Sequence, residues 1–318
     1  MTSNWARQDE RGSTLGVTFA ATLYRVLGRG ASLLLLSPGV LYFYLTGRAQ
    51  RRASMDYLNR MHELGHIPAK PGFWMGYHHF MAFTGAMLDR LGSWLGRFKP
   101  TDIDGADGED FKQAKAAGGA LILTAHLGNP DLLRAVATVN RRFRVNVLMD
   151  TENAEKYNGV INQLSKSSTV RLVQVTSIDV NVALSLSQAI ERGEWVVMAA
   201  DRRPAHNHGG VVPVSFLGGN VSMPMGPYIL GAALKCPVYC LACVRKDKGF
   251  KLIFDKLADQ MDLPRKSRLE AAGAYAQTYA NWLEQAVAQA PLQWFNFFDY
   301  WEPAATGDMT QDSEGTTH

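Results

Sequence analysis

Seven short apolar runs follow one another beyond residue 118, and segments with helical periodicity separate several of them. The strand-like runs are residues 119–126, 145–150, 169–175, 194–201, 212–216, 236–245 and 250–255. Residues 129–142, 154–166 and 180–193 space their apolar positions as helices do. Strands that are apolar on both faces need cover on both faces. The pattern therefore predicts an α/β domain whose largely parallel sheet carries helices on both faces.

The first fifty residues contain a long apolar and aromatic stretch. Its clearest uncharged window runs from Gly30 to Gly47, about the shortest length that spans a bilayer as a helix. Pro38 is expected to kink or break this helix. Interfacial aromatic residues at 42–44 and basic residues at 48–52 follow the window. We predict a membrane anchor that spans or half-inserts; a buried core helix is the alternative.

Helical patterns also lie on either side of the α/β region. Between Arg51 and Lys99 the helices are rich in aromatic residues and methionine on more than one face. This predicts deep burial or one wall of an apolar groove. Residues 265–290 form a last amphipathic helix, and the polar residues 303–318 are expected to be disordered. The predicted division is an anchor segment (1–50), one main domain (51–302) and a tail (303–318).

Composition and charge narrow the classes of function. The chain has 318 residues, is 47% hydrophobic and carries a formal net charge of +4, so it can bury a sizeable core but lacks the strong basic signal of a nucleic-acid binder. Its three cysteines, Cys236, Cys240 and Cys243, share one apolar run. An odd number in such a run favours a reducing compartment and core thiols over disulfides or a metal site.

A histidine and a carboxylate stand close together where the first strand of the domain ends. The run "ALILTA" delivers His126 at its carboxyl end, where open α/β sheets place their ligands. Gly128 permits a tight turn, Asn129 is a good helix N-cap, and Asp131 falls in the first helical turn. The two side chains can converge for catalysis. Alternatively, Asp131 only complements the helix dipole and His126 is a hydrogen-bonded strand end.

Two further stretches combine a strand end with polar or glycine-rich sequence. The run "EWVVMAA" ends in Asp201, Arg202 and Arg203, which suggests a site shared with His126 at one edge of the sheet. The segment "VSFLGGNVSMPMGP" brackets a turn before a helix with glycines and prolines. Its backbone N–H groups are able to hold an anion, although an ordinary loop is equally consistent with the residues.

These three blocks, in this order, resemble the lysophospholipid-acyltransferase superfamily, and more closely its bacterial lipid A biosynthesis (lauroyl/myristoyl) acyltransferase branch. The first block is His-x-x-x-x-Asp/Glu, matched by "HLGNPD" with His126 and Asp131. The second is an Asp-Arg pair, matched by Asp201 and Arg202. The later block is matched by Phe216 to Gly218 and by "PMGP" from Pro224. The closing "QWFNFFDYW" is similar to the subset associated with aryl polyene lipids.

The resemblance implies a glycerolipid-acyltransferase-like fold and an acyltransferase domain over residues 51–302. It implies transfer of a fatty acyl chain from acyl carrier protein or acyl-CoA to a hydroxyl of a membrane lipid at the cytoplasmic side of the inner membrane, with no cofactor or metal. His126 is then the general base and Asp131 orients it. The substrate-binding residues are then Asp201, Arg202, Arg203, Phe216, Gly218, Pro224 and Gly226.

The acceptor stays open at this stage. Lipid A enzymes commonly carry an aromatic residue and then Glu after "GN", whereas this chain has Pro130 and Asp131. A lipid A-like acceptor, another glycolipid and an aryl polyene lipid are therefore alternatives. Two other classes of function also remain: a thioesterase or esterase that uses the same His-Asp pair with water, and a non-catalytic membrane lipid-binding protein.

Overall fold

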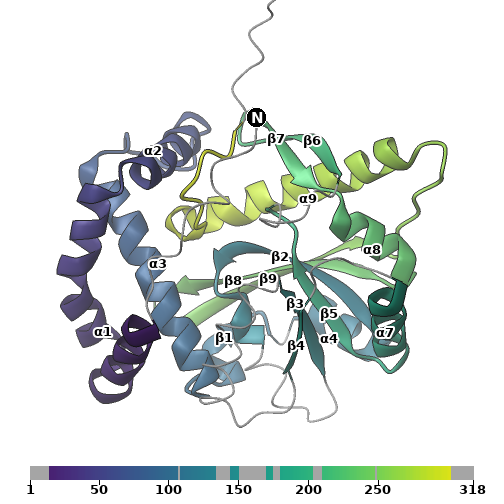
Figure 1. Cartoon of the computed structure of the whole chain (residues 1–318), viewed down its shortest axis with the longest axis horizontal. Helices are drawn as coiled ribbons and strands as arrows, with labels where there is room; N and C mark the ends of the chain where they lie inside the picture. Colours follow the sequence, from purple (N-terminus) through teal and green to yellow (C-terminus); the bar gives the residue numbers. More distant parts are fainter. Residues whose placement is uncertain are drawn as a thin grey trace, which may run out of the picture.

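A seven-stranded mixed sheet forms the centre of the molecule, with the strand order β1-β9-β8-β2-β5-β3-β4 (Figure 1). The computed structural model describes residues 14–106, 108–133, 144–149, 170–174, 180–202, 210–247 and 249–301. The strands are β1 (Ile103–Asp104), β2 (Ala120–Gly128), β3 (Val145–Met149), β4 (Val170–Gln174), β5 (Trp195–Ala199), β8 (Val238–Lys246) and β9 (Gly249–Ala258). Neighbouring strands are parallel except β8 and β9.

All seven predicted strands are present, but one of them lies outside the sheet. The run at 212–216 belongs to a separate antiparallel hairpin of β6 (Val211–Phe216) and β7 (Gly219–Pro224). The α-helices are α1 (Thr14–Thr46), α2 (Arg48–Glu63), α3 (Phe73–Trp94), α4 (Glu109–Ala117), α7 (Val180–Glu191), α8 (Gly226–Leu234) and α9 (Arg268–Gln289). Short 3₁₀ turns are η2 (Pro100–Asp102), η3 (Pro130–Leu132) and η4 (Pro291–Gln293). The predicted helix at 154–166 lies outside the described residues.

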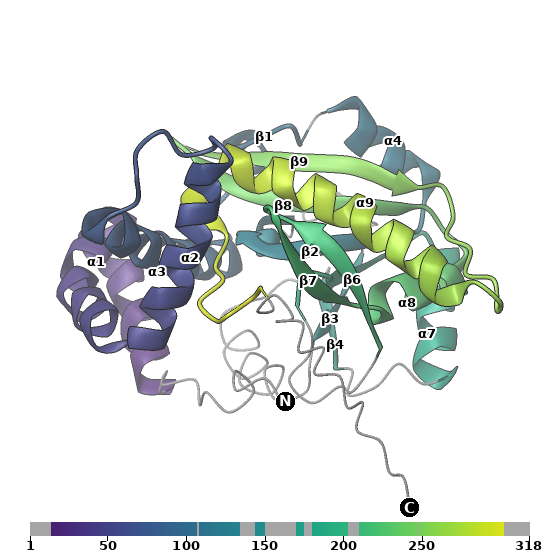
Figure 2. The same ribbon diagram turned by 90° about the horizontal axis from the view of Figure 1, so that it is seen from above.

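Successive side chains of β2 point to opposite faces of the sheet and enter two different apolar clusters, which is why helices cover both faces. Leu121, Leu123 and Leu127 are fully buried in the larger apolar cluster, which includes side chains of α2, α7, α8 and α9. Ile122 is fully buried in a second cluster with Phe111 of α4. Figure 2 shows α9 and α4 on opposite sides of the sheet. The predicted α/β fold with helices on both faces is therefore confirmed.

The three N-terminal helices gather beside the sheet, with α1 lying along α3 (Figure 1). A buried carboxylate links them to the sheet: Asp89 of α3, only 1% exposed, pairs with Arg29 of α1 at 2.8 Å and with Arg245 of β8 at 3.0 Å. A buried charge is tolerated only when it is paired. Asp89 therefore fixes the middle of α1 against the domain.

Helix α1 is interrupted at a different residue from the one predicted. It continues through Pro38, and its non-helical backbone angles fall at Gly28, where φ is 73°. Proline at position 38 removes the helical partner of the Leu34 carbonyl. The Ser37 hydroxyl donates to that same carbonyl at 2.7 Å and so replaces the missing bond. The expected break at Pro38 was wrong because the neighbouring serine repairs the helix.

The exposure of α1 argues against the buried-core interpretation of the N-terminal segment. Residues Thr22–Thr46 form a helix that is long and apolar enough, by length and composition, to cross a membrane, and 6% of its most apolar window is buried. A core helix would be mostly buried, so that alternative is wrong. The helix has the character of a membrane-associated element.

The cysteines are core thiols, as predicted. Cys236 precedes β8, and Cys240 and Cys243 lie on it; all three are free and buried. Burial raises the pKa of Cys236 to about 11 and those of Cys240 and Cys243 further. Thiols held in the protonated form are poor nucleophiles, so their role in the fold is packing.

Gly128 at the end of β2 is required by its backbone. Its φ is 64°, and a Cβ there would collide with the Cys243 carbonyl oxygen of the neighbouring strand. The next residue, Asn129, donates its backbone N–H to that carbonyl at 2.7 Å. The chain therefore turns tightly over β8, two residues after His126.

We expect Gly128→Ala to lower the free energy of unfolding by roughly 2–4 kcal/mol, because a left-handed residue and a backbone collision are introduced together. Gly273→Ala in α9 is the matched control, since nothing lies within 4 Å of its added Cβ. That control should gain about 0.5–1 kcal/mol from helix propensity. Urea unfolding of both variants measures the difference. Equal effects would contradict this account of the turn.

Candidate active site

Parallel pairing of β2 and β5 brings two strand ends together. The register places Thr124 beside Ala199, and the Ala200 N–H donates to the Thr124 carbonyl at 2.9 Å. His126 and Asp201 each lie two residues beyond these partners. They therefore meet at the carboxyl edge of the sheet, where open α/β sheets place their ligands.

His126 and Asp201 form a two-point contact. The His126 backbone N–H donates to Asp201 Oδ2 at 2.9 Å, and the imidazole Nδ1 lies 2.9 Å from Oδ1. An ionised carboxylate only accepts hydrogen bonds, so Nδ1 carries the proton and Nε2 carries the lone pair. The Asp201 side chain is fully buried, whereas 44% of the His126 side chain is exposed. This tautomer presents a basic nitrogen while the carboxylate holds the ring.

Burial and charge keep the two groups in complementary states. Burial opposes ionisation of Asp201, but His126 and Arg202 outweigh it and hold the pKa of the carboxyl well below its usual range. Packing of protein around His126 and the nearby Arg202 guanidinium lower the pKa of the imidazole below 6.5, against the opposing effect of Asp201. At neutral pH the pair is therefore a neutral imidazole beside a carboxylate.

Asp131 occupies a different place from the one predicted. Its carboxylate forms an ion pair with Arg90 of α3, and its carbonyl accepts from the Ser93 hydroxyl at 2.9 Å. Asn129 is the predicted cap: its side chain accepts the Asp131 N–H at 3.2 Å. Tethered on both sides, Asp131 belongs to the contact between η3 and α3. Asp201 stands at His126 Nδ1, the position that the sequence analysis assigned to Asp131.

Arg202 lies beside the pair and contacts the segment that follows η4. Its guanidinium donates to the Phe295 carbonyl and lies 5.1 Å from the centre of the Phe298 ring. The buried Nε of Arg202 has no hydrogen-bond partner among the described residues. Arg203 lies outside those residues. A guanidinium fixed at one nitrogen with another unsatisfied is suited to meet an anionic group.

The later block of predicted site residues is spread over the hairpin and the next helix. Phe216 is buried beside Trp294, with ring centres 5.3 Å apart. Gly218 forms the hairpin turn with φ at 70°. Pro224 ends β7 and Gly226 begins α8. Among the described residues, no hydrogen bond joins these last three to His126, and their substrate-binding role stays a prediction.

Sequence reasoning missed the residues after η4 that complete the site. The Trp294 indole N–H donates to Asp201 Oδ2 at 3.2 Å, and the Tyr300 hydroxyl donates to the Asp201 carbonyl at 2.6 Å. The Phe295 N–H donates to the His126 carbonyl at 2.9 Å. The density of aromatic residues in "QWFNFFDYW" was the available signal. Nothing in that stretch indicates which buried group it meets.

His79 supports Trp294 from α3. The imidazole is fully buried, with Nδ1 2.8 Å from the Ser54 hydroxyl and Nε2 2.9 Å from the Trp294 carbonyl. A carbonyl only accepts hydrogen bonds, so Nε2–H donates to the Trp294 carbonyl, and Nδ1 accepts a hydrogen bond from the Ser54 hydroxyl. Burial lowers the pKa of His79 to about 4. His79 is therefore a packed, hydrogen-bonded histidine that holds α3 against the segment after η4.

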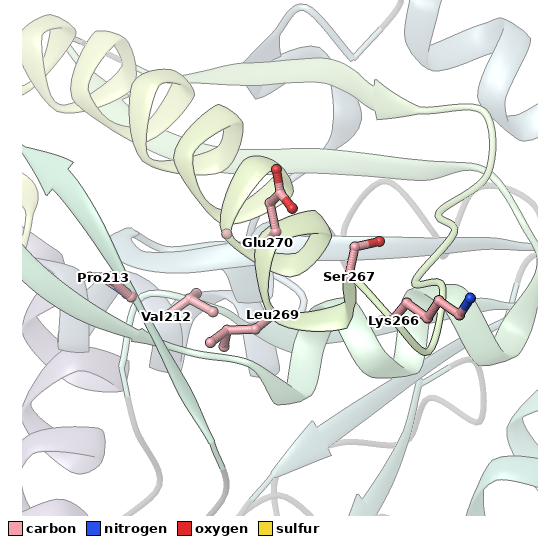
Figure 3. Close-up of a pocket in the computed structure, with 7 residues that line it drawn as sticks. Val212, Pro213, Lys266, Ser267, Leu269 and Glu270 are labelled. Atoms are coloured by element: carbon pink, nitrogen blue, oxygen red, sulfur yellow. The ribbon is translucent and has the colours of Figure 1, made fainter.

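One surface pocket lies elsewhere. It has a volume of about 430 Å³ and is lined by Val212, Pro213, Lys266, Ser267, Leu269, Glu270 and Gly273, at β6 and the beginning of α9 (Figure 3). No candidate site residue lines it.

Within the part of the chain that the structure describes, no group of three or more His, Cys, Asp or Glu is placed to hold a metal ion.

The fold and site define a class: α/β proteins that present a carboxylate-oriented histidine at the carboxyl end of a central parallel strand, the arrangement of a general base. A family model described as bacterial lipid A biosynthesis acyltransferase matches residues 90–302. Since the match covers more than half of the 318 residues, the chain belongs to the bacterial lipid A biosynthesis acyltransferase family. This confirms the resemblance and identifies an acyltransferase of lipids. No match to a curated protein is found; the aryl polyene subset stays a prediction.

The buried His79 predicts a pH-dependent stability. The unfolded state binds a proton near pH 6.5 and the folded state near pH 4, so stability falls as the pH drops through this window. We expect His79 to account for a loss of about 3 kcal/mol between pH 7 and pH 4. Urea unfolding of wild type and His79→Gln at both pH values isolates this contribution. The same pH slope in both proteins would contradict it.

Proposed function

We propose that this protein transfers a fatty acyl chain from a thioester, carried by acyl carrier protein or coenzyme A, to a hydroxyl group of a membrane lipid. The observation that carries the proposal is the His126–Asp201 pair: a neutral imidazole, fixed by a buried carboxylate, in a chain of this family. A lipid A-like acceptor, another glycolipid and an aryl polyene lipid fit this chemistry equally.

In the proposed reaction, His126 Nε2 takes the proton of the acceptor hydroxyl as its oxygen attacks the thioester carbonyl. The tetrahedral intermediate collapses, the carbon–sulfur bond breaks, and the imidazolium returns the proton to the departing thiolate. Asp201 stabilises the imidazolium between these steps. General-base catalysis of this kind contributes about 10²–10⁴-fold in rate.

We assign the electrostatic role in the site to the arginine that follows Asp201. The unsatisfied, buried Nε of Arg202 supports contact with the oxyanion of the intermediate or with an anionic part of either substrate. Arg203 follows it in the sequence and is proposed for the same region. We keep Phe216, Gly218, Pro224 and Gly226 as proposed substrate-binding residues on the strength of the family pattern.

The exposed faces of α1 and α3 support binding to a membrane. Large apolar side chains are exposed along both helices: Val26, Leu27, Leu34, Leu35, Tyr42, Phe43 and Leu45 on α1, and Phe73, Trp74 and Phe83 on α3. We call this set the apolar face. Arg48 and Arg52 are exposed directly after α1. Apolar surface with adjacent basic residues is typical of proteins that bind anionic lipid. We propose attachment to the cytoplasmic side of the inner membrane.

The central experiment compares three variants of the site. Membranes containing each protein are incubated with acyl carrier protein thioesters and host lipids, and mass spectrometry detects lipids that gain an acyl group. His126→Ala should abolish the product. Asp201→Asn should lower kcat by about 10²–10⁴-fold, because the imidazole loses its orienting partner. Asp131→Asn should cost less, because that carboxylate pairs with Arg90.

The outcomes separate an acyltransferase from a thioesterase and test the role of each residue. Free fatty acid with no acylated lipid would identify a thioesterase, although the sequence contains no Gly-x-Ser-x-Gly motif for a serine nucleophile. If the His126→Ala protein still acylates lipid, His126 is not the general base. A larger loss in Asp131→Asn than in Asp201→Asn would return the orienting role to Asp131.

A second experiment tests the apolar face with vesicles that contain phosphatidylglycerol. Leu34→Glu combined with Leu35→Glu should weaken co-sedimentation by about tenfold or more, because two exposed apolar side chains are replaced by charges. Leu269→Glu is the matched control: this leucine is 61% exposed at the start of α9, against 73% for Leu34. Equal loss in the control would show that the effect is not specific to α1.

A further inference from the structure

The segment after α9, residues 291–301, is bound to both members of the His126–Asp201 pair. Figure 2 shows it in yellow, passing between α2 and the β6–β7 hairpin. Trp294 forms a backbone bridge with Leu127, the residue next to His126. The Phe295 N–H donates to the His126 carbonyl at 2.9 Å. This segment therefore acts on the backbone that carries the imidazole.

The same segment restrains the carboxylate. Asp201 Oδ2 accepts both the His126 backbone N–H at 2.9 Å and the Trp294 indole N–H at 3.2 Å, while Oδ1 faces the imidazole. Tyr300 fixes the Asp201 carbonyl at 2.6 Å. Three donors around one buried carboxylate, with its carbonyl held as well, leave the group a single orientation.

Trp294 is itself held from several directions, so its N–H is well placed. Its ring is fully buried and lies 5.0 Å from the Tyr57 ring and 5.3 Å from the Phe216 ring. Its carbonyl accepts from His79 at 2.9 Å. Elements far apart in the chain, α2, α3 and β6, thus converge on one tryptophan that contacts Asp201.

We infer that Trp294 and Tyr300 are positioning residues of the active site: they fix Asp201, and Asp201 fixes His126. The inference rests on the proposed function in taking His126 as the base. Trp294 also has an electrostatic effect, because its indole N–H stabilises the negative charge of the Asp201 carboxylate. With that donor present, the carboxylate attracts a proton on the imidazole less strongly.

Removing the indole N–H donor should change two measured quantities, the pKa of His126 and the kcat for acyl transfer. Trp294→Phe keeps an aromatic ring but loses the N–H. The pKa of His126 should rise by about half a unit to one unit, because the carboxylate charge is less neutralised. The kcat for acyl transfer above that pKa should fall about tenfold while KM changes less than twofold, because the imidazole is less well oriented.

The matched control is Trp282→Phe. Trp282 of α9 donates its indole N–H to the carboxylate of Asp255 at 2.8 Å, so this change removes the same kind of bond from another place in the molecule. We expect the His126 pKa and the kcat to remain at wild-type values. A general weakening of the fold by loss of a buried indole would move both variants alike.

The His126 pKa is measured by NMR titration of the full chain labelled at its eight histidines, with the signal assigned from His126→Gln. This measurement needs no substrate, so it tests the contact even if the acyl-transfer assay fails. An unchanged His126 pKa in Trp294→Phe would overturn the inference. So would an unchanged kcat in a protein that does transfer acyl chains.

Tyr300→Phe provides a second test that removes a single oxygen atom. The Asp201 carbonyl loses its donor while the ring is kept, and we expect kcat to fall about threefold with KM unchanged. This variant decides the question if Trp294→Phe does not fold. Wild-type kcat in Tyr300→Phe would then overturn the positioning role of residues 291–301.

Discussion

The ionised carboxylate of Asp201, buried just beyond the end of β5, is the constraint around which the candidate active site is organised. A buried charge is stable only where donors surround it. Here the donors come from β2 and from the segment after α9. These donors reach Asp201 only if β2 lies beside β5 and the segment after α9 returns to the carboxyl edge of the sheet. The arrangement that satisfies the charge is also the one that orients His126.

Helix α3 contacts both α1, which carries most of the apolar face, and the surroundings of the His126–Asp201 pair. One of its faces holds α1 through Asp89 and Arg29, and Asp89 also reaches Arg245 in the sheet. The same helix holds η3 through Arg90 and Asp131 and holds Trp294 through His79. The helix that packs against α1 therefore also contacts the turn and the tryptophan beside the proposed general base, His126 of β2. An acceptor lipid held at the surface would have a fixed relation to His126, which favours transfer over hydrolysis.

Local patterns in the sequence were sufficient for the elements and for one half of the site. The seven apolar runs, the buried cysteines, the cap at Asn129 and the tight turn at Gly128 all depend on neighbouring residues, and the structure bears them out. The short strands β1 and β7 and the antiparallel pairing of β8 with β9 were not expected. Two residues, as in β1, are too few to show a period, and pairing direction depends on the whole sheet.

The sequence by itself determined that a histidine would stand at a strand end beside acidic residues, because apolar runs and turn residues fix where strands stop. Only the tertiary structure decided which carboxylate it meets. Asp131 is five residues from His126 in sequence, yet the capped turn directs it to Arg90. Asp201 is 75 residues away and arrives through the pairing of β2 with β5. Trp294 arrives only because the chain returns past α9. Such contacts depend on strand order and on the pairing of buried charges, and no spacing along the chain records either.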